Sequence, residues 1–145
     1  MRQFLLTIAL LVIAPAVQAE TLMGRVVGVA DGDSVTVLDG KLEQHKIRLQ
    51  GIDAPEKAQP FAQRSKANLS GLVFSKDVRV EWSKRDRYGR KIGKVWVQPD
   101  SCPTCAMTLD AGHAQITVGL ALPFTHKLCR PVDARRRHSI SSLKV

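Results

Sequence analysis

Hydrophobic and polar residues alternate along several short segments of the chain, with turn-forming residues between them. Alternation places every second side chain on one face, which is typical of β-strands that cover a core. The segments with this character are residues 23–29, 34–38, 44–49, 78–82 and 92–97. Asp-Gly pairs separate the first three segments, so we predict that these strands form a meander.

Two further segments have helical spacing. Between residues 60 and 74, apolar residues recur three and four positions apart, and Pro60 suits the first turn of a helix. A second short helix is predicted over residues 108–122. Three strands, a helix and two more strands is the order of a small Greek-key barrel. We therefore predict a mainly β, α+β chain whose five-stranded OB-fold barrel has one helix after the third strand and a second short helix.

The first 19 residues have the pattern of an export signal. Arg2 precedes an apolar run over residues 4–14, and Val17-Gln18-Ala19 predicts cleavage after Ala19. The run is too short to cross a bilayer, which needs about 20 apolar residues. We therefore expect a secreted or periplasmic monomer that does not contact the membrane after cleavage.

The formal net charge of +9 is unevenly distributed, because the last 24 residues contain six Lys and Arg but one Asp. A basic surface favours polyanionic partners, although most such surfaces are simply solvated. The expected organisation is a signal at residues 1–19, one domain at residues 20–121 and a divergent, disordered basic tail at residues 122–145.

Four short motifs carry the residues expected to do chemistry. They are Asp31-Gly32-Asp33-Ser34, Ile47-Arg48-Leu49, Gly51-Ile52-Asp53-Ala54-Pro55-Glu56 and Asp86-Arg87-Tyr88-Gly89-Arg90. Asp33 and Asp53 lie at strand ends of the meander, so their carboxylates can converge as oxygen ligands for Ca²⁺. Two guanidinium groups, from Arg48 and Arg90, suit the oxygens of a phosphodiester. Glu56 could orient or deprotonate an attacking water.

The same motifs resemble those of the thermonuclease family, whose type member is staphylococcal nuclease. The segments that carry the resemblance are VVGVADGDSVTV, KIRLQGIDAPEKAQPFAQRSKANL and DRYGRKIGKV. It covers residues 23–97 and resumes weakly over residues 112–121. It implies a Ca²⁺-dependent endonuclease that cleaves the 5′ P–O bond of DNA or RNA.

The resemblance also implies roles for individual residues. Asp33 and Asp53 would ligate Ca²⁺, together with the backbone carbonyl of Ala54, where the type member has a threonine. Asp31 would support the metal site without ligating the ion.

The remaining implied roles concern the substrate. Arg48 and Arg90 would hold the scissile phosphate, and Glu56 would act on the water. Arg87 and Tyr88 would contact the nucleotide. A non-catalytic nucleic-acid-binding OB module is the alternative interpretation of the same motifs.

The cysteines suggest a separate feature. Cys102 and Cys105 form a CxxC pair, which in an exported protein favours a local disulfide over a metal site or free thiols. A zinc site would need further ligands, for which His113, Cys129, or the histidines His126 and His138 are candidates. Cys129 is an odd third cysteine that could pair between chains. A metal or redox module centred on CxxC is a third, weaker hypothesis.

The C-terminal end departs from the family pattern after Ala121. The family continues with an aromatic loop and a long charged helix, whereas Pro123 and Pro131 argue against a helix here. We therefore expect the C-terminal helix to be missing, through either an altered reading frame near codon 121 or a genuinely divergent tail. Loss of that support would destabilise the domain and impair activity.

Overall fold

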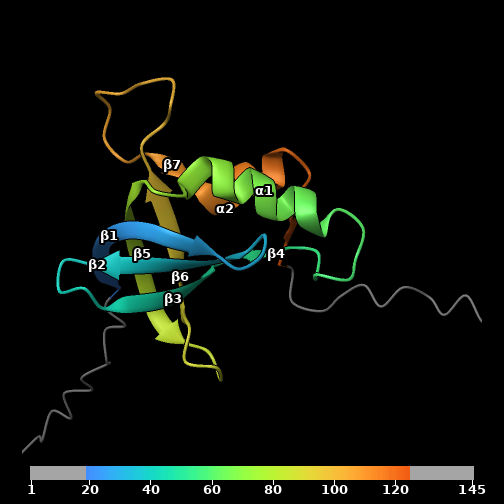
Figure 1. Cartoon of the computed structure of the whole chain (residues 1–145), viewed down its shortest axis with the longest axis horizontal. Helices are drawn as coiled ribbons and strands as arrows, with labels where there is room; N and C mark the ends of the chain where they lie inside the picture. Colours follow the sequence, from blue (N-terminus) through green and yellow to red (C-terminus); the bar gives the residue numbers. More distant parts are fainter. Residues whose placement is uncertain (1–18, 125–145) are drawn as a thin grey trace, which may run out of the picture.

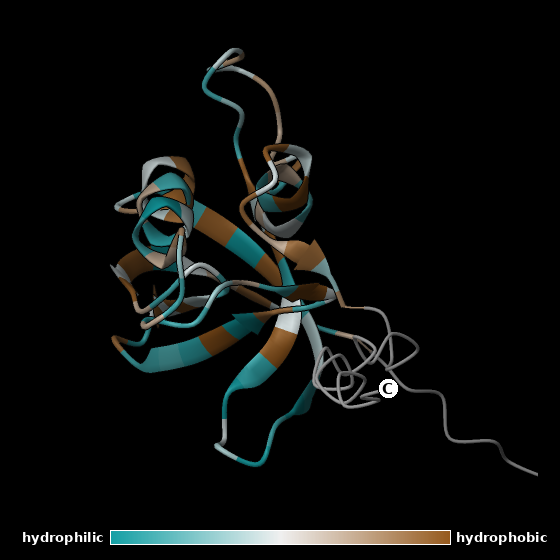
Figure 2. Cartoon of the chain, turned by 90° about the vertical axis from the view of Figure 1, so that its right-hand side faces the viewer, coloured by the Kyte–Doolittle hydropathy of each residue, from teal (hydrophilic) through white to brown (hydrophobic). Residues whose placement is uncertain are grey.

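The inward positions of the long strands are occupied almost entirely by branched apolar residues, which is why the strands close around one core. The structure is a computed structural model that describes residues 19–124. The long strands are β1 (Glu20–Val29), β2 (Ser34–Asp39), β3 (Gln44–Leu49), β5 (Asp77–Arg85) and β6 (Lys91–Val97). Val26, Val37, Val80 and Val95 are all fully buried in this core. Figure 2 shows the resulting alternation of hydrophobic and hydrophilic residues along the strands.

Closure of the barrel depends on one parallel strand pair. The strands pair in the order β3-β2-β1-β5-β6, and β3 then pairs with β6, matching Ile47 to Lys91 and Leu49 to Gly93. Closing the sheet removes its free edges. This confirms the predicted five-stranded OB-type barrel with two helices.

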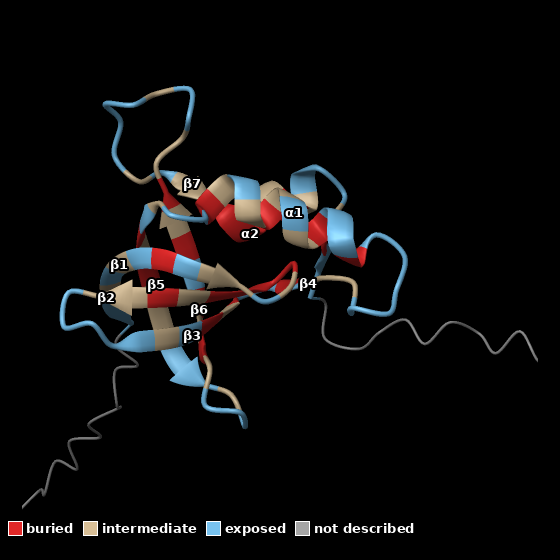
Figure 3. Cartoon of the chain, viewed as in Figure 1, coloured by how far each residue is buried: buried red, intermediate tan, exposed pale blue. Residues whose placement is uncertain are grey.

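Both helices lie at one end of the barrel (Figure 1). Helix α1 (Ala62–Val73) buries Leu69 and Val73 against the core, and helix α2 (Ala111–Thr117) follows the short strand β7 (Leu109–Asp110). Figure 3 shows buried residues on both helices as well as along the strands. No helix within residues 19–124 is long and apolar enough to span a membrane.

The helix boundaries differ from the predicted ones. Phe61 adopts φ 67° immediately before α1, so Pro60 lies outside the helix instead of in its first turn. The second helix is shorter than the predicted segment because Asp110 caps its start, accepting from the backbone N of Gly112 at 2.9 Å and of His113 at 3.2 Å. Gly119, at φ 71°, lies in the turn just beyond its end.

The described fold extends beyond the predicted boundary at residue 121. Strand β8 (Leu122–Pro123) pairs with β4 (Ile52–Asp53), and the backbone N of Phe124 donates to the carbonyl of Gly51 at 2.8 Å. Residues 122–124 therefore belong to the folded unit. Residues 1–18 of the predicted signal (residues 1–19) and residues 125–145 of the predicted tail (residues 122–145), with Cys129, lie outside the described residues.

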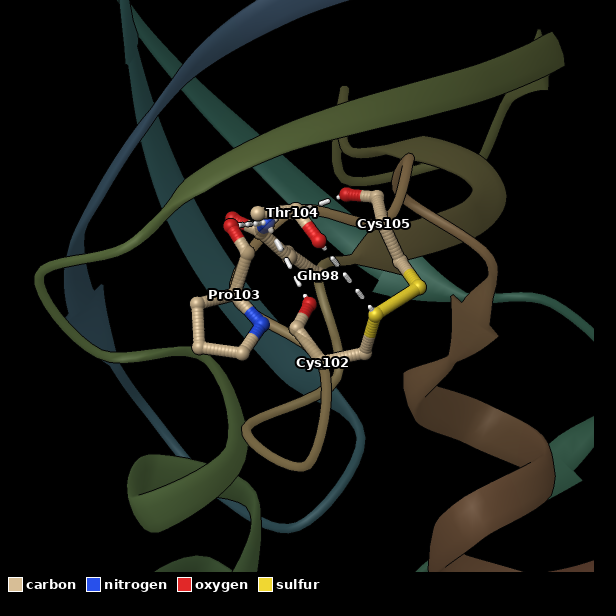
Figure 4. Close-up of a disulfide and its surroundings, with 5 residues drawn as sticks. All are labelled: Gln98, Cys102, Pro103, Thr104 and Cys105. Atoms are coloured by element: carbon tan, nitrogen blue, oxygen red, sulfur yellow. Dashed lines mark hydrogen bonds between the residues drawn. A yellow bond between two sulfur atoms is a disulfide. The ribbon is translucent and has the colours of Figure 1, made fainter.

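A disulfide links Cys102 and Cys105 in the loop between β6 and β7 (Figure 4). The side-chain amide of Gln98 donates to the carbonyl of Cys105 at 2.9 Å and also to that of Pro103. One glutamine thus satisfies several backbone acceptors of the CxxC loop. Because both sulfurs are in the disulfide, this form of the protein offers neither thiolate to a metal.

Candidate active site

The first part of the site is the turn between β1 and β2, which carries Asp31, Gly32 and Asp33. The backbone N of Asp33 donates to Asp31 Oδ1 at 3.1 Å, and the Ser34 hydroxyl donates to Asp33 Oδ1 at 2.8 Å. A Cβ on Gly32 would lie 1.9 Å from Ser65 Oγ, so only glycine fits against α1 at this point. The turn is therefore packed in place, with the side chain of Asp33 buried.

Arg48 links the two predicted metal-binding carboxylates. Its Nη2 lies 3.2 Å from Asp33 Oδ2 and donates to Asp53 Oδ1 at 3.1 Å. The register of β2 and β3 places Arg48 opposite Ser34, beside the turn, and β4 brings Asp53 to the same point. Both carboxylates thus face one positive group.

Arg90 is positioned by the turn between β5 and β6. Asp86 accepts from the backbone N of Tyr88 and of Arg90, each at 2.9 Å, and from Arg90 Nε at 2.7 Å. Gly89, at φ 78°, permits this tight turn. Arg90 Nη1 then donates to Ser34 Oγ at 3.2 Å, which ties the arginine to the residue that follows Asp33.

All the predicted catalytic, metal-binding and nucleotide-binding residues line one open cavity of about 520 Å³. Its lining includes Asp31, Asp33, Arg48, Asp53, Ala54, Glu56, Arg87, Tyr88 and Arg90. Within residues 19–124, the exposed Glu56 carboxylate makes no hydrogen bond or ion pair, so it remains available to a ligand in the cavity. The fold therefore brings together motifs that are up to about sixty residues apart in the chain.

A second cavity of about 610 Å³ adjoins the first and shares Arg48, Arg87, Tyr88 and Arg90 with it. Its remaining lining combines the apolar Leu49, Ile52, Ile92 and Phe124 with Gln50, Gly51, Lys84 and Asp86. Phe124 lies beyond the predicted domain boundary and was not predicted to belong to the site. Its aromatic character was the signal that could have indicated this.

The buried position of Asp33 shifts the pKa of its carboxyl. Burial raises the pKa of its carboxyl, and the neighbouring Asp31 acts in the same direction. The Ser34 hydroxyl and the Arg48 guanidinium oppose the shift without cancelling it. A buried carboxylate of this kind favours a cation beside it.

Asp86 is a structural residue of the site to which the sequence analysis assigned no role. Burial alone would raise the pKa of its carboxyl, but hydrogen bonds from Arg90 and Tyr88 outweigh burial and lower it. Its position at the start of the DRYGR motif, four residues before Arg90, was the available signal.

The chemistry of the donor set fits a hard cation such as Ca²⁺. Asp33 and Asp53 supply carboxylate oxygens on either side of the Arg48 guanidinium, and Ala54 lies in the same cavity wall. A second group of ligand atoms, from Asp39, Glu43 and His45, lies within 4.8 Å of one another at the opposite end of the β2–β3 hairpin. Asp39 there already accepts from His45 Nε2 at 2.9 Å and from two backbone N–H groups.

Comparison with known proteins adds independent information. Residues 46–127 match the model of the staphylococcal nuclease homologue family. The chain is 40% identical to Protein ParB of Escherichia coli over 114 residues, which are 79% of this chain and 63% of that protein. It is 43% identical to an uncharacterized endonuclease of Haemophilus influenzae over 99 residues, covering 67% of this chain and 56% of that protein.

A micrococcal nuclease of Shigella flexneri is 41% identical over 73 residues, which are 50% of this chain and 41% of that protein. The chain thus spans 63% and 56% of the length of the first two relatives. The range that the family model matches, residues 46–127, includes Arg48, Asp53, Glu56 and Arg90, whereas Asp33 precedes it.

Proposed function

Because the chain belongs to the staphylococcal nuclease homologue family, we propose that it is an endonuclease that hydrolyses phosphodiester bonds of DNA and RNA. The observation that carries the proposal is the 520 Å³ cavity, in which two guanidinium groups, the carboxylates of Asp33 and Asp53 and the exposed Glu56 converge. The non-catalytic binding module would need none of these carboxylates.

The arginines bind the scissile phosphate in this proposal. Arg90 is held by Asp86 with its Nη1 directed toward Ser34, and Arg48 lies across the cavity wall beside Asp33 and Asp53. Guanidinium groups form paired, charge-assisted hydrogen bonds to phosphate oxygens. Their attraction increases as negative charge develops on those oxygens in the transition state.

Glu56 activates the water. Its carboxylate takes a proton as the water oxygen bonds to phosphorus, and the bond from phosphorus to the 5′ oxygen breaks. The departing oxygen keeps the bonding electrons and takes up a proton from solvent. Pro55 restrains the backbone next to Glu56, and the backbone N of Glu56 donates to Gln59 Oε1 at 2.9 Å, which shapes the loop that presents the carboxylate.

Asp33, Asp53 and the carbonyl of Ala54 are the groups that would hold Ca²⁺. Bound there, the ion would neutralise charge on the phosphate oxygens and so assist the arginines. The 610 Å³ cavity beside the first would receive the nucleoside next to the scissile phosphate, with Tyr88 on its wall to contact the base.

Function outside the cytoplasm is part of the same proposal. The predicted signal over residues 1–19 and the Cys102–Cys105 disulfide both suit an oxidising compartment. The enzyme is proposed to act there as a monomer.

A digestion assay on the chain from residue 20 to 145 tests the function. The protein is expected to cut double- and single-stranded DNA and RNA with Ca²⁺ and to stop when the ion is chelated. Glu56→Gln should abolish cutting while preserving DNA binding, whereas Glu43→Gln, at the far end of the β2–β3 hairpin, should cut normally. Unchanged cutting by Glu56→Gln would refute the assigned role, and tight Ca²⁺-independent binding without cutting would support the binding module.

A further inference from the structure

A buried glutamine in α2 contacts the turn that carries Asp31 and Asp33. Gln115 is fully buried, and its Nε2 donates to the carbonyl of Gly32 at 2.9 Å and to the carbonyl of Ser65 at 2.9 Å. The same nitrogen lies 3.3 Å from Ser65 Oγ. One side chain therefore joins α2, α1 and the metal-binding turn.

The other end of the Gln115 amide is also engaged. Its Oε1 accepts a hydrogen bond from the side chain of Asn68 on α1. With both ends bonded, the amide has one orientation, in which its N–H groups face Gly32 and Ser65. Buried polar groups that are fully bonded restrict the alternatives open to the backbone they contact.

Gly32 has little freedom at this contact. A Cβ there would meet Ser65 Oγ at 1.9 Å and Ala54 Cβ at 2.8 Å, so the turn lies directly on α1 and on the loop that follows Asp53. The Gln115 hydrogen bond to the Gly32 carbonyl adds direction to this close packing. The close packing of Gly32 and the hydrogen bond from Gln115 together fix the positions of the flanking residues Asp31 and Asp33.

The chain after Gln115 reaches the second carboxylate. The backbone N of Leu120 donates to the carbonyl of Gln115 at 3.0 Å, and the chain then enters β8, where Leu122 pairs with Asp53. The segment from Gln115 to Pro123 therefore contacts the turn carrying Asp33 at one end and the strand carrying Asp53 at the other.

We propose that Gln115 is a positioning residue for the metal site, and that the segment from Gln115 to Pro123 sets the separation between Asp33 and Asp53. The inference rests on the proposed function for the identity of the bound ion, but its structural part does not. Groups that orient metal ligands from outside the coordination sphere typically alter metal affinity about 10- to 100-fold when they are replaced.

The test uses Gln115→Leu, which keeps the volume of the side chain and removes its hydrogen bonds. Leu22→Ala serves as the matched control. Leu22 packs against the core near the start of β1, whereas the turn follows the end of β1, so its truncation should lower stability without changing the turn. Calcium binding by the folded variants is measured by calorimetry. Gln115→Leu should bind Ca²⁺ about 10- to 100-fold more weakly, whereas Leu22→Ala should bind it about as tightly as the parent protein.

A second readout needs no metal. Amide hydrogen exchange of Asp33 and Ala30, whose backbone N–H groups are bonded within the turn, should accelerate more in Gln115→Leu than the global loss of stability explains. Amides of Val78 and Val80, on the far strand, should follow the global change alone. Exchange at Asp33 that tracks Val80 would overturn the proposal.

The two readouts separate the possible failures. If the parent protein binds no Ca²⁺, the proposed metal is wrong, and the exchange data still decide whether Gln115 holds the turn. If Gln115→Leu does not fold, Asn68→Ala replaces it, because this change removes the bond that orients the Gln115 amide and leaves Gln115 itself in place. Asn68→Ala should accelerate exchange at Asp33 by a smaller factor, and an unchanged rate there would also overturn the proposal.

Discussion

The carboxylate of Asp86 accepts hydrogen bonds from both the backbone N and the side chain of Arg90. The bond from Arg90 Nε to Asp86 Oδ2 is 2.7 Å long. The carboxylate therefore fixes the turn and the direction of the guanidinium at once. Because the pair lies next to the cavity and is only partly exposed, solvent competes weakly with this contact.

Replacing Asp86 with Asn should lower the rate of phosphodiester cleavage. The variant retains an acceptor for the backbone but loses the charge that holds Arg90, and a misplacement of about 1 Å at a catalytic group can cost about 100-fold in rate. We expect kcat to fall by up to that factor with a small change in KM. Asp77→Asn is the control, because Asp77 binds Arg25 on an exposed part of the barrel. Equal kcat for Asp86→Asn and the parent protein would argue against the positioning role.

The same pair predicts a pH dependence of stability. The folded-state pKa of Asp86 is lowered by Arg90 and Tyr88 despite burial, so the unfolded state binds the proton more readily. The resulting stabilisation is fully present above about pH 3.9, the ordinary value for Asp, and is lost as the pH falls through the lower folded-state pKa. Urea unfolding between about pH 6 and pH 3 measures it. The stability gap between the parent protein and Asp86→Asn should shrink at the acid end, and a constant gap would contradict the linkage.

Arg48→Met should reduce cleavage and strengthen the response to Ca²⁺. Loss of one group that stabilises charge on the reacting phosphate typically costs about 100- to 1,000-fold in kcat. Without the guanidinium, Asp33 and Asp53 have no shared positive partner, so a cation should stabilise the folded variant more than it stabilises the parent. Thermal melts with and without Ca²⁺ check this. A smaller rise in Tm for Arg48→Met would show that Arg48 does not compete with the ion.

Gly32→Ala should destabilise the domain through steric overlap. The new Cβ would lie 1.9 Å from Ser65 Oγ and 2.8 Å from Ala54 Cβ, and overpacking of this kind costs about 1–3 kcal/mol. Gly40→Ala offers a matched comparison, because nothing lies within 4 Å of a Cβ there. Its stability should stay within about 0.5 kcal/mol of the parent. Chemical denaturation of both variants gives the answer, and equal stabilities would show that the turn can move away from α1.

Local patterns were sufficient for the five long strands, and their order predicted the barrel, whereas the two-residue strands β4, β7 and β8 were not predicted. Alternation over residues such as Val78 and Val80 indicates which face of the strand lies toward the core. This pattern can be found from neighbouring residues in the sequence alone. Helix ends were predicted less well. Phe61 takes a left-handed conformation that its sequence does not indicate, and the Asp110 cap shortens α2 at its start.

The residue types of the site could also be predicted from the sequence, because four motifs with carboxylates and arginines in this order are specific to one family. These residues were expected to lie close together, and they line one cavity in the structure. Their catalytic and metal-binding roles stay predictions. No role was predicted for Asp86, because the motif alone does not indicate which of its residues forms the hydrogen bonds that position the others.

The sequence by itself determined the alternating strands, the turn at Asp31–Asp33 and the set of charged residues available for chemistry. Only the tertiary structure decided that Gln115 reaches Gly32, 83 residues away, and that Leu122 pairs with Asp53 beyond the predicted end of the domain. The physical reason is that a buried hydrogen bond or a two-residue strand leaves no periodic trace in the chain. Such contacts exist only where closure of the barrel brings distant segments within bonding distance.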